Sequence, residues 1–122
     1  ITTPSNAIDF GDLTVARNEV GACASFTRGI FGGGTSVNII DYVTISTPGN
    51  ALDFGDLVGG RRYLGACSNS TRGVFGGGDT TGYYNLIDYI TISVIGNAID
   101  FGDLLVQRGY LAACSDGHGG LS

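Results

Sequence analysis

The chain has 122 residues, of which 43% are hydrophobic, and its net charge is −5. This apolar content suffices for a packed core, which excludes wholesale disorder, and no apolar run approaches the roughly 20 residues that cross a bilayer as a helix. The six cations are scattered arginines, so the sequence disfavours contact with a phosphate backbone and predicts neither a nucleic-acid partner nor membrane insertion. Glycine occurs 22 times and proline only twice, which is typical of many short strands and tight turns.

One phrase of nine residues occurs three times. It reads SNAIDFGDL at 5–13, GNALDFGDL at 49–57 and GNAIDFGDL at 96–104, so that the repeats are 44–47 residues long. A period in the forties belongs to propeller blades or to helical-hairpin solenoids. Because the chain has a single glutamate and no lysine, which helical repeats need, the sequence predicts all-β, four-stranded antiparallel blades.

In chain order, the repeat divides the sequence into four parts. These are the end of a partial blade (1–13), two full repeats (14–57 and 58–104), and a partial terminal repeat or C-terminal cap (105–122). A closed propeller needs at least four blades, and this chain holds about two and a half. We therefore expect part of a larger or oligomeric propeller, and the lack of any methionine suggests that the sequence begins inside a longer polypeptide.

Four strands are expected in the second full repeat, over 61–68, 72–78, 86–93 and 98–104. In the third of them, Asp88, Ile90 and Ile92 share a face with Leu86. The fourth is expected to be an outer strand entered through a Gly-Asn turn at 96–97. The glycine runs at 31–34 and 75–78 are not followed by the Lys-Ser/Thr pair or the helix of a phosphate cradle. We expect them instead to let neighbouring strands approach closely.

Charged residues of both signs recur once per repeat. The simplest interpretation is an arginine–carboxylate contact within each blade or between neighbouring blades, the D-F-G-D acids included. Calcium is the alternative, but it prefers six to eight oxygen ligands, and two acids three residues apart supply too few. We therefore expect no metal and no cofactor. The structural repeat residues are Arg17, Arg61, Arg108, Arg28, Arg72, Asp9, Asp12, Asp53, Asp56, Asp100, Asp103, Asp41 and Asp88.

Cysteine also recurs once per repeat, as Cys23, Cys67 and Cys114, each after an alanine. An odd set at one register predicts small buried residues rather than disulfides. His118 is the only histidine, and with Cys114 and Asp116 it could form a nucleophilic pair with an orienting acid. Because the other two cysteines have no such histidine, we expect no catalytic residue here and a hydrogen-bonding role for His118.

The loop at 76–85 is three residues longer than its counterpart at 32–38, and an exposed connection tolerates such a difference. It carries Tyr83 and Tyr84, which have no counterpart in the first repeat, together with Asp79. Adjacent aromatic side chains on an exposed loop can stack on a sugar ring or anchor a partner protein. The alternative is that they pack over the neighbouring blade. These three residues are the candidate ligand contacts of the sequence.

The residues also carry a family resemblance. Arg61, Gly65-Ala66, the run RGVFGGG at 72–78 and Ile87-Asp88-Tyr89 resemble a kelch repeat, a β-propeller unit, with phenylalanine near the position of the family's tryptophan. TRGVFGGG, NLIDYITIS, GNAIDFGDL and SDGHGGLS together resemble kelch-like repeats of structural proteins in tailed phages, particularly cyanophages.

That resemblance implies an extracellular virion protein, such as a tail fibre or another appendage. Its partners would be other virion proteins and a host-surface glycan or receptor, and a homo-oligomer is expected. The alternatives are a cellular kelch-type propeller for protein interaction and an enzyme on a kelch scaffold, such as a copper oxidase. The lack of clustered histidines argues against the enzyme.

Overall fold

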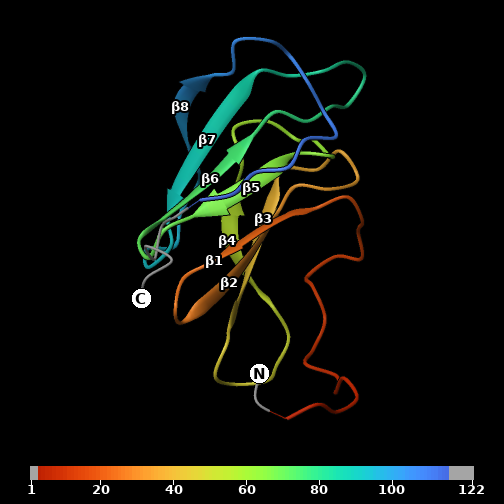
Figure 1. Cartoon of the computed structure of the whole chain (residues 1–122), viewed down its shortest axis with the longest axis vertical. Helices are drawn as coiled ribbons and strands as arrows, with labels where there is room; N and C mark the ends of the chain where they lie inside the picture. Colours follow the sequence, from red (N-terminus) through yellow and green to blue (C-terminus); the bar gives the residue numbers. More distant parts are fainter. Residues whose placement is uncertain (1–2, 116–122) are drawn as a thin grey trace.

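Short strands rich in apolar residues and glycine fold into two similar sheets. The computed structural model describes residues 3–115, and over this range the protein is all-β, as predicted, with no helix (Figure 1). Each sheet is antiparallel, and its four strands lie side by side in chain order. No helix within that range is long and apolar enough to span a membrane. The strands are β1 (Gly21–Ala24), β2 (Arg28–Gly32), β3 (Ile39–Thr44) and β4 (Leu52–Asp56) in the first sheet, and β5 (Gly65–Ser68), β6 (Arg72–Gly76), β7 (Leu86–Thr91) and β8 (Ile99–Asp103) in the second.

The first sheet lies within residues 14–57, called the first unit below, and the second lies within residues 58–104, called the second unit. Equivalent strands pair in equivalent register: Phe31 faces Asp41 across β2 and β3, and Phe75 faces Asp88 across β6 and β7. In β7 the face that carries Asp88 and Ile90 is buried, as the alternation of the sequence indicates.

Two local expectations are wrong. The first strand of the second unit begins at Gly65 rather than at residue 61, because Tyr63 has a φ of 54° and Arg61 points into the core. The turn after β7 closes through a hydrogen bond from Val94 N–H to the Thr91 carbonyl, 3.0 Å long. The Gly-Asn pair at 96–97 lies beyond that turn and contacts the preceding unit instead.

The D-F-G-D phrase forms a β-bulge. Between β3 and β4 the register shifts at Ile40 and Asp41, so that Phe54 is the extra residue on β4. Gly55 follows with a φ of 143°, and its N–H donates to Asp53 Oδ1 at 3.1 Å. A bulge re-aims side chains at the edge of a sheet. Here it turns Phe54 inward, where its ring meets Tyr42 edge to face at 5.9 Å between centroids.

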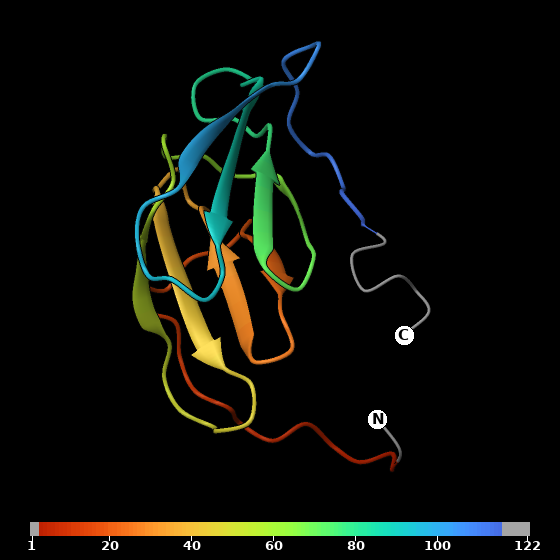
Figure 2. The ribbon, with the colours of Figure 1, turned by 90° about the vertical axis from the view of Figure 1, so that its left-hand side faces the viewer.

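The two sheets lie next to each other and meet through β1 and β5 (Figure 2). The hydrophobic core runs across this junction. Phe75 from the second sheet fills the space beside Gly32 of the first, where a Cβ would lie 2.7 Å from the Phe75 ring. Glycine at this position therefore permits the close approach that the sequence predicts. The core consists of Ile30, Ile40, Tyr42, Phe54, Leu57, Leu64, Phe75, Ile90 and Ile92.

Candidate functional site

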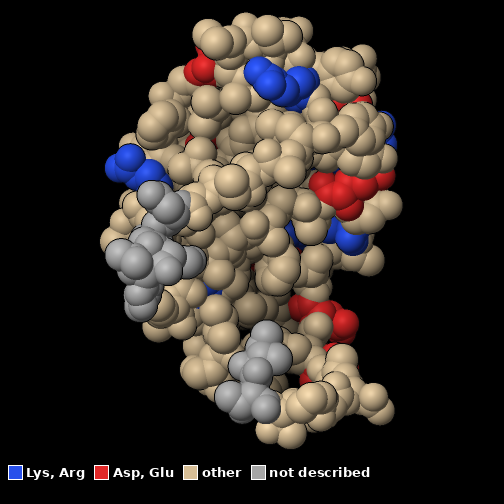
Figure 3. Space-filling model, in the orientation of Figure 1, with Lys and Arg blue, Asp and Glu red and all other residues tan. Residues whose placement is uncertain are grey.

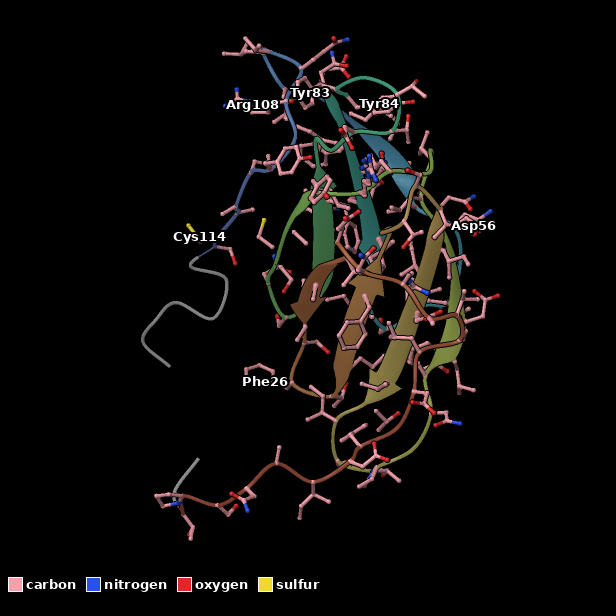
Figure 4. The ribbon with its side chains drawn as sticks, turned by 90° about the vertical axis from the view of Figure 1, so that its right-hand side faces the viewer. Phe26, Asp56, Tyr83, Tyr84, Arg108 and Cys114 are labelled. Carbon is pink, nitrogen blue, oxygen red and sulfur yellow. The ribbon has the colours of Figure 1, made fainter. Side chains whose placement is uncertain are left out.

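Six polar and aromatic side chains gather where residues 18–19, the segment before β5, the β6–β7 loop and residues 108–110 meet. We call them the tyrosine cluster: Glu19, Arg62, Tyr63, Asp79, Tyr83 and Tyr110. The β6–β7 loop reaches the segment before β5 through reciprocal backbone bonds between Arg62 and Asp79, of 3.0 and 2.9 Å. Figure 4 shows Tyr83 and Tyr84 at the same end of the molecule as Arg108, away from Phe26.

Stacked rings form the centre of the cluster. The rings of Tyr63 and Tyr110 lie 3.9 Å apart between centroids, at an interplanar angle of 23°. Tyr110 is 65% exposed, so the outer face of the stack is open. Glu19, Tyr63 and Tyr110 occupy equivalent positions of the repeat, and all three have a positive φ, of 63°, 54° and 56°. This backbone region is uncommon for residues other than glycine, and such conformations cluster at functional sites.

Charged groups fix the inner ring. The Tyr63 hydroxyl donates to Glu19 Oε1 at 2.6 Å, and this hydrogen bond raises the pKa of Tyr63 to about 12. Arg62 lies over the Tyr63 ring at 5.2 Å from its centroid. Its Nε donates to Asp79 Oδ1 at 3.0 Å, which raises the pKa of Arg62. The cluster thus presents an open aromatic face that is bordered by carboxylates and one guanidinium.

Of the three predicted contacts, Asp79 and Tyr83 belong to the cluster and Tyr84 does not. Tyr83 is 53% exposed and its ring covers Gly109, so that it both packs over the following segment and faces solvent. Tyr84 is half-buried, and its hydroxyl shares a hydrogen bond with Thr80 Oγ1 at 3.1 Å. Asp79 is held by Arg62 rather than left free for a ligand.

Sequence reasoning missed the other members of the cluster. Tyr63 lies in a predicted strand and Tyr110 in the predicted partial repeat, yet both stand where the first unit has Glu19. That variation at one repeat position was the available signal. The sequence does not show the left-handed backbone conformation that turns the side chains at these positions outward.

Buried ion pairs connect the segment before each sheet with its third strand. Arg61 Nη1 donates to Asp88 Oδ2 at 2.9 Å, and neither side chain has any exposed surface. Arg61 also donates to the carbonyls of Gly77 at 2.7 Å, Gly59 at 3.1 Å and Phe75 at 3.3 Å. Arg17 and Asp41 repeat the pair at 2.9 Å in the first unit. Arg61 is thus held by several hydrogen bonds, whereas Arg17 donates one, to the Phe31 carbonyl at 3.3 Å. Both pairs support the framework rather than a ligand.

The D-F-G-D acids do not pair with arginine, and that expectation is corrected. The first acid of each phrase makes the same local contact: Asp9, Asp53 and Asp100 accept the N–H of Gly11, Gly55 and Gly102, each at 3.1 Å. The second acid has a backbone role, because Asp12 and Asp56 N–H donate to the side chains of Asn50 and Asn97. Among residues 3–115, no arginine lies within 4.0 Å of any carboxylate of the three phrases.

The remaining repeat arginines contact rings or solvent. Arg28 lies over the Tyr42 ring at 4.6 Å and Arg72 over the Tyr89 ring at 4.5 Å. Arg28 also donates to the Ile92 carbonyl at 2.7 Å, which links the first unit to the second. Arg108 is exposed. Arginines stand apart from one another on the face drawn in Figure 3, most of which is uncharged.

The cysteines line one hollow of about 400 Å³, together with Phe26 and several serines. Cys23 and Cys67 are half-buried and Cys114 is exposed, so the expectation of three buried thiols is wrong for Cys114. Cys23 packs against Gly73 of the second unit, and burial raises the pKa of its thiol to about 12. No residue of a following unit covers Cys114 within the range described. A thiol so difficult to ionise is a poor nucleophile and metal ligand.

The described range contains no group of three histidine, cysteine, aspartate or glutamate side chains placed to hold a metal ion. Asp116 and His118 lie outside it, so the geometry gives no test of the pair with Cys114. Neither the protein-family models nor the curated proteins include a match to this chain.

Proposed function

We propose that the chain is a non-catalytic binding module of a virion appendage, built from kelch-like propeller blades, which contacts a sugar of the host surface through the tyrosine cluster. One observation carries this proposal: the stacked pair of Tyr63 and Tyr110 leaves an open ring face, with Tyr83 beside it. An aromatic face covers the C–H side of a sugar ring, while neighbouring carboxylates and guanidinium groups bind its hydroxyls.

The order of the strands supports the blade interpretation. Each four-stranded antiparallel sheet runs in chain order from the junction outward, and β1 neighbours β5 of the next unit. Radial repetition of such sheets around an axis is the architecture of a propeller. The cluster would lie on one rim of that propeller, where the equivalent positions 19, 63 and 110 of successive units come together.

The surface charge favours a neutral ligand over a polyanion. The net charge is −5, and the single arginine of the cluster is engaged by Asp79 and Glu19. A sulfated or phosphorylated polymer would meet these carboxylates, and the exposed Arg108 nearby is only a single cation. We therefore assign the cluster to neutral or amino sugars.

Binding to immobilised glucose, galactose and N-acetylglucosamine, alone and as short oligomers, tests the assignment. Tyr110→Ala and Tyr83→Ala should each weaken retention at least tenfold, because each removes an aromatic face at the centre of the contact. Phe26→Ala is the matched control, since Phe26 is 80% exposed but lies beside the cysteine hollow. Equal retention of the tyrosine variants and the wild type, or no retention of any sugar, contradicts the proposal.

The virion assignment has a separate test. An antibody against the chain should label an appendage of purified phage particles in electron micrographs. Labelling that is found only in uninfected host cells would instead favour a cellular interaction propeller.

A further inference from the structure

Successive units are joined by one repeated set of contacts. In the joint to the second unit, the carbonyls of Phe54 and Asp56 accept the N–H of Gly96 and Ala98 at 2.9 and 2.8 Å. Asp56 N–H donates to Asn97 Oδ1 at 3.0 Å. Farther along, Val58 N–H and Arg61 both donate to Asp88.

The same joint occurs at the first unit. There the carbonyls of Phe10 and Asp12 accept the N–H of Gly49 and Ala51, both at 2.8 Å. Asp12 N–H donates to Asn50 Oδ1 at 2.9 Å, and Thr14 N–H and Arg17 reach Asp41 at 3.0 and 2.9 Å. Residues 6–17 therefore contact the first unit in the same way as residues 50–61 contact the second unit.

A third copy of the joining segment has no partner within residues 3–115. Residues 97–108 repeat residues 6–17 except at two positions, where Leu105 and Gln107 replace Thr14 and Ala16. The inter-unit hydrogen bonds of Phe54 and Asp56 have no counterpart at Phe101 and Asp103 in that range. The loss of cover is large: Phe101 is 56% exposed, whereas Phe54 is 1% exposed. Arg108 is exposed, whereas Arg61 is fully buried.

We propose that this edge, residues 97–108, docks onto the first unit of a second copy of the chain and replaces that copy's own residues 6–17. Residues 109–115, which already lie beside β5 as β1 does, replace residues 18–24 of that copy. The two segments carry nearly the same sequence and therefore the same set of donors and acceptors. Arg108 then pairs with Asp41 of the second copy, and Asn50 of that copy binds Asp103 N–H. The exchange is head-to-tail, so it builds rings or filaments rather than a closed dimer of identical contacts.

The competing segments differ in how well they are ordered before docking. Residues 3–16 belong to no strand, and all of them but Leu13 are exposed. Residues 99–103 already form β8, which pairs with β7 from Leu86–Asp103 to Tyr89–Ile99. A segment that is fixed in advance loses less conformational entropy on binding. The β8 edge therefore has an advantage over the segment it displaces, and it gains burial of Phe101.

The geometry also indicates substitutions that should promote or block the replacement of one segment by the other. A Cβ on Gly11 would collide with the Gly49 carbonyl, so Gly11→Ala expels the chain's own segment and leaves the receiving surface intact. Arg108→Glu changes a side chain that is exposed in the single chain and that would oppose Asp41 in the assembly. Thr81→Glu is the control, because Thr81 is exposed in the β6–β7 loop and makes none of the contacts of the joint.

Light scattering coupled to size-exclusion chromatography, over a series of concentrations of the full chain, tests the proposal. The wild type should pass from the mass of one chain to multiples of it, and Gly11→Ala should do so at roughly tenfold lower concentration. Arg108→Glu should keep the mass of one chain throughout, while Thr81→Glu follows the wild type. A wild type that remains single at all concentrations, or an Arg108→Glu variant that assembles equally well, overturns the proposal. The double variant Gly11→Ala/Arg108→Glu should remain single, and its assembly would overturn the proposal too.

Discussion

The two buried aspartates differ by one hydrogen bond from the residue at positions 14 and 58, and this difference predicts a stabilising substitution. In the first unit, Thr14 donates to Asp41 twice, from its N–H at 3.0 Å and from its hydroxyl at 2.7 Å. Val58 holds the equivalent position in the second unit, and only its N–H reaches Asp88. The second oxygen, Asp88 Oδ1, is buried and has no hydrogen-bond partner within residues 3–115. Val58→Thr should supply the missing donor.

The expected gain is about 1–2 kcal/mol in the free energy of unfolding. A buried acceptor without a partner costs about 1–3 kcal/mol, and a hydrogen bond to a charged group contributes about 1.5–3 kcal/mol. The substitution exchanges a methyl for a hydroxyl, and Val58 is already 52% exposed, so the lost apolar burial is at most about half of 0.8 kcal/mol. The reverse change, Thr14→Val, should cost about 1–2 kcal/mol for the same reason.

Urea unfolding of the single chain, followed by circular dichroism, measures both changes in the free energy of unfolding. In thermal unfolding, the same changes should raise or lower the melting temperature by roughly 5 °C. Val15→Thr is the control. It makes the same chemical change at a residue that is 49% exposed and has no buried carboxylate beside it. The reasoning fails if Val58→Thr is neutral or destabilising relative to that control. It also fails if Thr14→Val leaves the midpoint unchanged.

Four further predictions concern the framework and the titrating groups. Arg61→Ala should cost about 3–5 kcal/mol in urea unfolding, because it leaves Asp88 buried without its cation, whereas Arg108→Ala should cost almost nothing in the single chain. Iodoacetamide at neutral pH should label Cys114 first and Cys23 last, as mass spectrometry of timed samples would show; similar rates for both contradict the assigned burial. Because Tyr63 is protonated up to a pKa of about 12 when folded and about 10 when unfolded, its contribution to stability is complete below pH 10 and lost between pH 10 and 12. Tyr63→Phe should reduce that loss. EDTA should leave the melting temperature unchanged, and a large drop would favour calcium at the D-F-G-D acids.

The repeat period, read from the sequence, predicted most of the secondary structure. Because strand positions recur at a fixed offset, an interpretation made in one unit carries over to the other, and β6, β7 and β8 overlap their expected ranges closely. The boundary that failed, at the start of β5, depends on Tyr63. A positive φ at a non-glycine residue does not alter the hydrophobic pattern of the sequence. That pattern also does not distinguish the buried Arg61 from an exposed arginine on a strand.

The pairing of charges was predictable only in part. Recurrence showed that arginine and aspartate occur together in each unit, but it could not show which aspartate meets which arginine. Asp41 and Asp88 lie on the third strand, within reach of the segment that enters each sheet. The D-F-G-D acids lie on a bulged edge where backbone N–H groups are closer than any guanidinium. Three-dimensional proximity, which the period does not encode, decides between them.

The triplicated phrase is better understood as a joint than as a site. Its first aspartate accepts the N–H of its glycine, and that glycine allows the carbonyl of the next unit to approach. Its phenylalanine is buried where units lie on both sides, as at Phe54. None of these roles needs a ligand, and all of them recur wherever one unit meets the next. The sugar-binding proposal rests instead on positions 63, 83 and 110, where the units differ from one another. In the proposed assembly, identical joints would carry variable rim residues, so the array could lengthen or close without altering its proposed binding surface.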